Sequence, residues 1–184
     1  RLTNSQSFKF IDNCPQCDSK LVREDGEVHH YCLNSNFCPP QIKGKIIHFI
    51  GRKQMNIDGI GSETIDQLYS AGLINNIADL YTLKKEDLLP LDRMAEKSAD
   101  NIINGILESK KAPFNKILFG LGIRFVGETV AKKLTAHFQN INQLRTATFE
   151  ELCNIDEVGG KIAESIVAYF KLDFNNEIVN RLLG

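Results

Sequence analysis

The sequence predicts a mainly α-helical protein: a small four-cysteine finger followed by four copies of one helical unit, forming two paired modules. Three observations predict this fold class. Four of the five cysteines fall within 25 residues near the N-terminus. The rest of the chain repeats one pattern at intervals of 34, 32 and 32 residues. Within each repeat, apolar residues recur at helical spacing.

Length and composition are those of an ordinary globular protein. The 184 residues suffice for one or two domains, and 42% are hydrophobic and 24% charged. No apolar run is long enough to span a bilayer, so we expect no membrane partner. The chain opens on Arg1 rather than Met and has no signal peptide, which suggests a piece of a longer protein.

The cysteines of the finger are spaced C-x2-C-x14-C-x5-C. They are Cys14, Cys17, Cys32 and Cys38. Residues 20–31 predict a short β-hairpin, turning at Asp25-Gly26, that brings the two pairs together. Four thiolates in a tetrahedral array are typical of a structural zinc site with no position open for water. Two disulfides are the alternative, and His29 and His30 could compete as ligands. Because nothing indicates secretion, we predict zinc.

The repeats begin at Ile57, Leu91, Ile123 and Ile155 and share the pattern apolar-x-x-apolar-small. Residues with helical period follow each pattern, and helical patterns also precede it, as after Pro113 and at 149–152. Each unit is therefore predicted to be a helix, a tight turn and a helix, and two units are expected to form a compact five-helix module. We assign residues 1–46 to the finger, 47–112 to the first pair of units and 113–184 to the second.

This pattern matches the helix-hairpin-helix motif, whose turn reads apolar-x-Gly-apolar-Gly. Glycines allow positive φ and let the backbone approach a ligand closely. The turn amides and the N-terminus of the second helix would then point at one spot that suits a DNA phosphate. Because no base edge is contacted, binding should not depend on DNA sequence. The alternative is that the units are only packed helices, but glycines at the turn rather than in the core favour binding.

Both turn positions hold glycine only in the first copy. The first position holds Phe125 in the third copy and Glu157 in the fourth, and the second copy has Arg93 and Ala95 instead of both glycines. We predict that copies one, three and four bind phosphate and that copy two is mainly structural, although Arg93 and Lys97 could still reach DNA. The predicted DNA-binding residues are Gly59, Gly61, Arg124, Gly127, Thr129, Lys132, Gly159, Gly160 and Lys161.

The net charge of −1 hides two basic stretches. Residues 43–56 carry four bases and no acid, and residues 110–137 carry six bases and one acid, whereas residues 57–109 are acidic. Such segregation allows local contact with phosphates. The third copy has the strongest electrostatic support, from Arg124 in its turn and from Lys132 and Lys133 on its second helix.

A four-cysteine finger followed by four such units resembles the bacterial NAD-dependent DNA ligases. Local motifs support the resemblance over nearly the whole chain: Cys14-Pro15-x-Cys17, Ile47-His48-Phe49, Asp79-Leu80-Tyr81 and Leu121-Gly122-Ile123-Arg124-Phe125-Val126-Gly127-Glu128-Thr129. The chain departs from the family pattern at Arg93 and Ala95, and at Phe125, where the family often has histidine.

The resemblance implies an enzyme that seals nicks in duplex DNA during replication and repair, using NAD and Mg²⁺. The adenylation, OB-fold and BRCT domains of such an enzyme would be partners outside this chain. Residues 23–26 and 56–59 read x-x-Asp-Gly and lack the adenylated lysine of the family's Lys-x-Asp-Gly motif, so we expect no catalytic site here. We expect a monomer in the bacterial cytoplasm, on the nucleoid when bound to duplex DNA. A DNA-binding module of another repair protein and a protein-docking domain are the alternatives.

Overall fold

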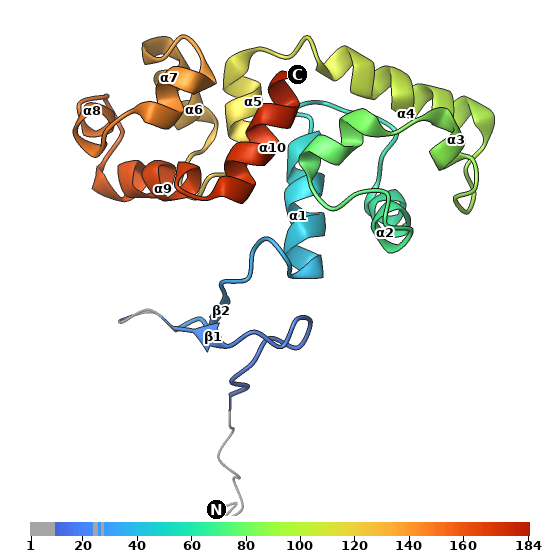
Figure 1. Ribbon diagram of the computed structural model, residues 1–184, viewed down its shortest axis with the longest axis horizontal. Coiled ribbons are helices and arrows are strands. Elements are labelled where there is room, and N and C mark those ends of the chain that lie inside the picture. Colours follow the sequence, from blue (N-terminus) through green and yellow to red (C-terminus); the bar gives the residue numbers. More distant parts are fainter. Residues whose placement is uncertain (1–9, 24–25, 27) are drawn as a thin grey trace, which may run out of the picture. The chain divides into compact units, whose positions relative to one another are not determined.

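The computed structural model describes residues 10–23, 26 and 28–184. The chain forms two compact units, Arg1–Ile42 and Lys43–Gly184. Helices dominate the described residues, which confirms the predicted fold class (Figure 1). In this part of the chain no helix combines the length and the hydrophobicity that crossing a bilayer requires.

The first unit contains a short antiparallel hairpin, in which β1 (Leu21–Val22) pairs with β2 (Tyr31–Cys32). An isolated bridge between Asn13 and Lys20 extends the pairing towards the first cysteines. The predicted hairpin is therefore confirmed, although its second strand, Tyr31–Cys32, begins only at the end of the predicted range 20–31. The predicted turn residue Asp25 lies outside the described residues.

The second unit holds the repeated helices, and α1 begins in the first unit and continues into it. The helices are α1 (Pro39–Ile50), α2 (Ser62–Ser70), the 3-10 helix η1 (Ile77–Thr82), α3 (Lys85–Leu88), α4 (Glu96–Ser109), α5 (Phe114–Gly120), α6 (Glu128–His137), α7 (Ile141–Thr146), α8 (Phe149–Cys153), α9 (Gly160–Phe170) and α10 (Asp173–Leu183). The pairs α1–α2, α3–α4, α5–α6 and α8–α9 flank the four predicted turns. Each repeat is therefore a helix, a turn and a helix.

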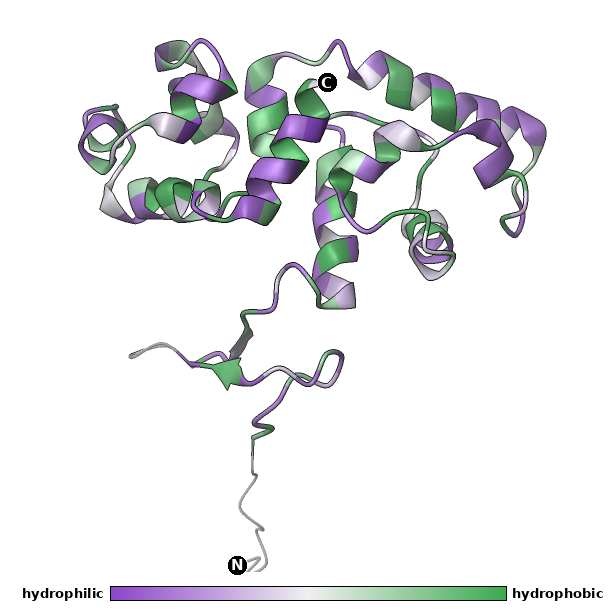
Figure 2. Cartoon of the chain, viewed as in Figure 1, coloured by the Kyte–Doolittle hydropathy of each residue, from purple (hydrophilic) through white to green (hydrophobic). Residues whose placement is uncertain are grey.

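The second helix of every repeat buries the same two positions. The fully buried residues are Ile65 and Leu68 in α2, Ala99 and Ile102 in α4, Ala131 and Leu134 in α6, and Ala163 and Ile166 in α9. Because positions three apart lie on one face of a helix, both residues of each pair face the core. Figure 2 shows the resulting alternation of hydrophobic and hydrophilic residues around helices such as α4.

Two connecting helices complete the pairs. η1 lies between α2 and α3, and α7 lies between α6 and α8. Each begins after an asparagine that caps it: Asn76 Oδ1 accepts from Ala78 N at 2.9 Å, and Asn140 Oδ1 accepts from Gln143 N at 3.0 Å. With these connectors, each pair of units comprises five helices.

The last helix, α10, contacts both pairs of units, since it packs on η1 and on α9. Figure 1 shows it running beside α5. Arg181 Nη1 lies 2.7 Å from Asp79 Oδ1. The other carboxylate oxygen of Asp79 accepts from the amides of Asn75 and Asn76 at 2.7 and 2.9 Å, at the start of η1. One carboxylate therefore both caps η1 and holds α10.

Replacing Arg181 by alanine is expected to lower the free energy of unfolding by about 1–2 kcal/mol, because it leaves the largely buried carboxylate of Asp79, 15% exposed, without its cation. In a protein of this size the melting temperature should fall by about 3–6 °C. Lys111→Ala is the control: it removes an exposed pair with Glu108 and should cost less than about 0.5 kcal/mol. Equal melting temperatures for the two variants would contradict a stabilising role for the Arg181 pair.

Candidate metal centre and nucleic-acid interface

The four predicted zinc ligands meet in the first unit. The sulfurs of Cys14, Cys17, Cys32 and Cys38 all lie within 4.8 Å of one another. The Cys14–Cys38 and Cys17–Cys32 sulfur distances are 4.0 and 3.5 Å. Four sulfurs bound at 2.3 Å to one tetrahedral ion lie about 3.8 Å apart, so the cluster fits a single zinc ion. All four are free cysteines, and neither His29 nor His30 belongs to the cluster.

The surroundings of the sulfurs require a cation if all four are to be thiolates. Desolvation raises the pKa of Cys32 to about 12 and also raises the pKa of Cys38. Hydrogen bonds with Ser19 lower the pKa of Cys17 to about 6. Gln41 Nε2 donates to the carbonyl of Cys32 at 2.9 Å and fixes the start of α1 to β2. The donor set and its geometry support a structural zinc.

The four turns of the second unit share one backbone shape. The first turn position has positive φ in every copy: 87° at Gly59, 57° at Arg93, 66° at Phe125 and 67° at Glu157. The second position has φ between −98° and −81° and extended ψ, and it is the N-cap of the following helix. These N-caps are Gly61, Ala95, Gly127 and Gly159. The bend is therefore present even where its glycine is replaced.

Glycine serves different purposes at the two positions. Positive φ explains Gly59, although three other residue types adopt the same conformation at a cost of about 1–2 kcal/mol each. At the second position φ is negative, and any residue could adopt the observed conformation. A Cβ added to Gly61, Gly127 or Gly159 would meet no atom within 4 Å. Neither conformation nor internal packing explains these three glycines, and their missing side chains leave space in front of a helix.

The helices behind the turns begin without a side-chain cap. None of the four N-cap residues makes a side-chain cap hydrogen bond. The first helical bonds run to their carbonyls, for example from Ala131 N to Gly127 O at 2.9 Å and from Ala163 N to Gly159 O at 3.1 Å. In α9 the amide of Ile162 also donates to Gly159 O at 3.0 Å. The amides of the first two residues of each helix have no carbonyl four residues back within the helix, and the helix dipole makes this end positive. An anion can accept hydrogen bonds there.

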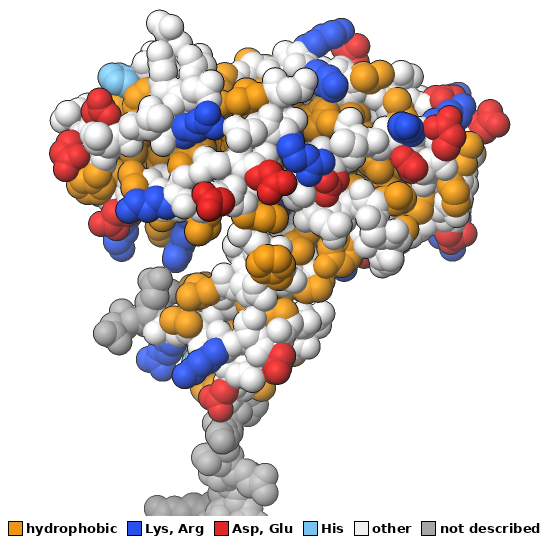
Figure 3. All heavy atoms as spheres, viewed as in Figure 1, with side chains coloured by type: hydrophobic (Ala, Val, Ile, Leu, Met, Phe, Trp, Pro, Cys, Tyr) orange, Lys and Arg blue, Asp and Glu red, His pale blue; other side chains and the backbone are white. Residues whose placement is uncertain are grey.

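Many basic side chains of the two basic stretches are paired with acids. Lys132 Nζ lies 2.8 Å from Glu128 Oε1, and Lys133 Nζ lies 2.7 Å from Asp156 Oδ2 in the fourth turn. Lys53, beside the first turn, lies 3.8 Å from Glu128 at the third. Charges that are segregated in the sequence are thus interleaved in space, and Figure 3 shows both signs mixed over the face in view. Lys133 of α6 thus reaches the fourth turn, and Lys53 reaches the start of α6.

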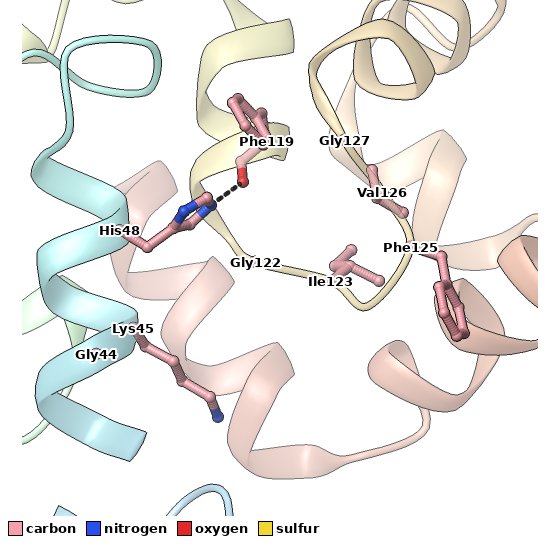
Figure 4. Close-up of a pocket in the computed structure, with 9 residues that line it drawn as sticks. All are labelled: Gly44, Lys45, His48, Phe119, Gly122, Ile123, Phe125, Val126 and Gly127. Carbon is pink, nitrogen blue, oxygen red and sulfur yellow. Dashed lines mark hydrogen bonds between the residues drawn. The ribbon is translucent and has the colours of Figure 1, made fainter. Parts of the chain in front are cut away.

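The remaining predicted contacts lie at or beside the starts of α6 and α9. The Arg124 guanidinium carbon lies 4.8 Å from the centre of the Phe125 ring, and both residues are exposed. Thr129, Gly160 and Lys161 are also exposed, within the first two residues of their helices. Figure 4 shows Phe125 projecting away from the third turn.

Sequence reasoning missed a cavity of about 550 Å³ beside the third turn (Figure 4). Lys45 and His48 of α1 line it together with Phe125 and Gly127. Within α1 these two residues are three apart and share one face. That spacing was the only available signal, because the sequence does not tell which helix α1 faces.

Three family models match the chain. Residues 13–39 match the NAD-dependent DNA ligase C4 zinc finger domain, residues 54–106 the SAM-like helix-hairpin-helix tandem and residues 116–179 the helix-hairpin-helix motif. These segments contain the cysteine cluster and all four turns.

Proteins named DNA ligase match nearly the whole chain. The one from Bacteroides fragilis is 56% identical over 182 residues, which is 99% of this chain and 27% of that protein. The one from Christiangramia forsetii is 57% identical over 179 residues, and the one from Halalkalibacterium halodurans is 47% identical over 182. The chain spans 27% of the length of each of these relatives. With its zinc finger, its hairpins and these relatives in agreement, the chain belongs to the bacterial NAD-dependent DNA ligase family as a zinc-finger and helix-hairpin-helix segment.

Proposed function

We propose that this chain grips duplex DNA, without reading its sequence, by holding backbone phosphates at the starts of α2, α6 and α9. The observation that carries the proposal is the set Gly61, Gly127 and Gly159. Each lacks a side chain where the protein has no internal reason for it, in front of a helix without a side-chain cap. Phosphate oxygens suit these amides, and phosphates are the same in every sequence. Arg124, Thr129, Lys132, Gly160 and Lys161 would border the phosphates held at the third and fourth turns.

The charge distribution supports binding through local contacts. The net charge is −1, and Lys132 and Lys133 are already paired with acids. Long-range attraction of DNA should therefore contribute less than hydrogen bonds made at the turns. Gly59 fits this role through the positive φ that shapes the first turn.

In the parent enzyme this segment would hold nicked duplex while other domains perform the chemistry. The parent would form its adenylate from NAD and seal the nick with Mg²⁺ during replication and repair, in the bacterial cytoplasm or on the nucleoid. The segment would act as a monomer and contribute no catalytic residue, with a finger at 1–46 and pairs of units at 47–112 and 113–184. The x-x-Asp-Gly sequence at 56–59 supports this, because it lacks the lysine that would carry the adenylate.

The finger has the features of a docking element for another domain of the parent. Large apolar side chains on it are exposed, among them Phe10 (63%), Leu33 (67%) and Phe37 (72%). Exposed apolar side chains of this density are typical of a protein contact rather than of a DNA contact. The finger would therefore brace a neighbouring domain, such as the OB-fold, while the turns hold DNA.

Titration of the chain with nicked duplexes of unrelated sequences tests the DNA proposal. The dissociation constants are expected to agree within about threefold, because phosphates carry no sequence information. With one phosphate at each of three turns, log K should fall with log salt concentration with a slope of about −3. A chain that does not bind nicked duplex at low salt, but binds another ligase domain, would replace the DNA proposal with the docking one.

A further inference from the structure

The cavity beside the third turn joins two distant parts of the sequence. Lys45 and His48 of α1 form one wall, and Ile123, Phe125 and Gly127 of the third turn form the other. Figure 4 shows the Lys45 side chain extending from α1 into the space on the side of the turn. The helix α1, which precedes the first turn, thus supplies a cation next to the third turn.

Close packing between α1 and α5 holds the walls of this cavity in place. His48 Nε2 lies 2.9 Å from the carbonyl oxygen of Phe119, and Gln54 Nε2 lies 3.3 Å from His48 Nδ1. Since the Gln54 amide donates to Nδ1, the His48 Nε2 carries the proton that is donated to Phe119. A Cβ on Gly120 would come within 2.9 Å of the Phe49 ring, so α5 has no room to shift towards α1. The cavity is therefore formed before any ligand binds.

The lining of the cavity is amphipathic. Phe119, Ile123, Phe125 and Val126 offer apolar surface, Lys45 offers an ammonium group, and none of the lining residues is acidic. Burial lowers the pKa of Lys45, and a bound anion would offset that loss of hydration. A sugar–phosphate unit has the complementary character, with an apolar deoxyribose face and a charged phosphate.

We infer that this cavity is a subsite for one sugar–phosphate unit of the DNA strand held at the third turn, with Lys45 binding the phosphate adjacent to the one at Gly127. The inference rests on the proposed function, because it requires DNA at that turn. It assigns to α1 a DNA contact outside the hairpin turns.

A double-mutant cycle between Lys45 and single phosphates tests the subsite. The probe is a nicked duplex in which one phosphate at a time is replaced by a neutral methylphosphonate. Lys45→Gln should weaken binding of the unmodified duplex about tenfold and make the salt slope shallower by about 0.9. At one position the methylphosphonate should weaken binding of the wild type about tenfold but leave Lys45→Gln unchanged. Lys45→Arg should retain the salt slope of the wild type.

Lys111→Gln is the matched control, because it removes the same charge beyond the C-terminus of α4, at the end away from the second turn. It should match the wild type, and circular dichroism verifies that each variant is folded. If Lys45→Gln has the same affinity and salt slope as the control, while the wild type binds nicked duplex with a steep salt slope, the subsite is overturned and the proposed function stays intact. The same cycle with Gly127→Ala identifies the phosphate held at the third turn. If the phosphate coupled to Lys45 is not adjacent to that one, the subsite is also overturned. A wild type that does not bind at all overturns the proposed function itself.

Discussion

A Cys38→Ser variant is expected to lose zinc and to unfold the first unit, while the helices of Lys43–Gly184 remain. The reason is the composition of the core of the finger. Among its described residues, the buried apolar side chains are Cys14, Cys38 and Ile42, and two of these three are metal ligands. A unit this small cannot bury enough apolar surface to fold alone. The metal should supply on the order of 10 kcal/mol of its folding free energy.

Atomic absorption and amide NMR would measure this effect. The wild type should contain about one zinc ion per chain, since four sulfurs complete one tetrahedral site. Chelation should remove the β1–β2 resonances and leave those of α4 and α9 in place. Cys153→Ser is the control, because this half-buried cysteine in α8 lies outside the cluster. A metal-free chain that retains an intact β1–β2 hairpin would refute the zinc assignment.

The parts of the fold predicted from sequence are those encoded over short distances. The cysteine spacing predicted which four sulfurs lie together, and the repeated pattern located all four turns. The expected five-helix modules include one connecting helix each, but its position was not predicted, although Asn76 and Asn140 each precede an apolar residue in a local capping signal. The helix α10 was also missed as the element that joins the two pairs, because its contact with η1 depends on residues about one hundred positions away.

The number of glycines does not determine the shape of the turns, for a physical reason. Phe125 and Glu157 disfavour positive φ, yet both adopt it. In the third turn Ile123 and Val126 are each 4% exposed, and their burial fixes the bend whatever residue lies between them. Tertiary packing therefore overrides the local preference. The pairing of Lys133 with Asp156 could not be predicted from local sequence either, since it depends on how the third repeat packs against the fourth.

Gly127→Asp is expected to weaken binding of nicked duplex about a hundredfold, because a carboxylate would occupy the space left for phosphate and repel it. The same change should leave stability equal or raise it by a few tenths of a kcal/mol. Gly127 already has the extended backbone of an N-cap, and aspartate caps helices better than glycine. Gel-shift titration and thermal melting would measure the two effects separately.

Loss of affinity without loss of stability distinguishes a DNA contact from damage to the fold. Gly127→Asn adds a side chain of similar size without the charge, so an intermediate affinity would separate steric exclusion from repulsion. Ala95→Asp is the matched control, because it places the same carboxylate at the same position of the second turn, which already has a Cβ. If copy two is mainly structural, Ala95→Asp should change affinity less than about threefold, since its carboxylate would face no phosphate. Equal losses in the two variants would mean that the second turn also holds DNA, whereas unchanged affinity in Gly127→Asp would exclude the third.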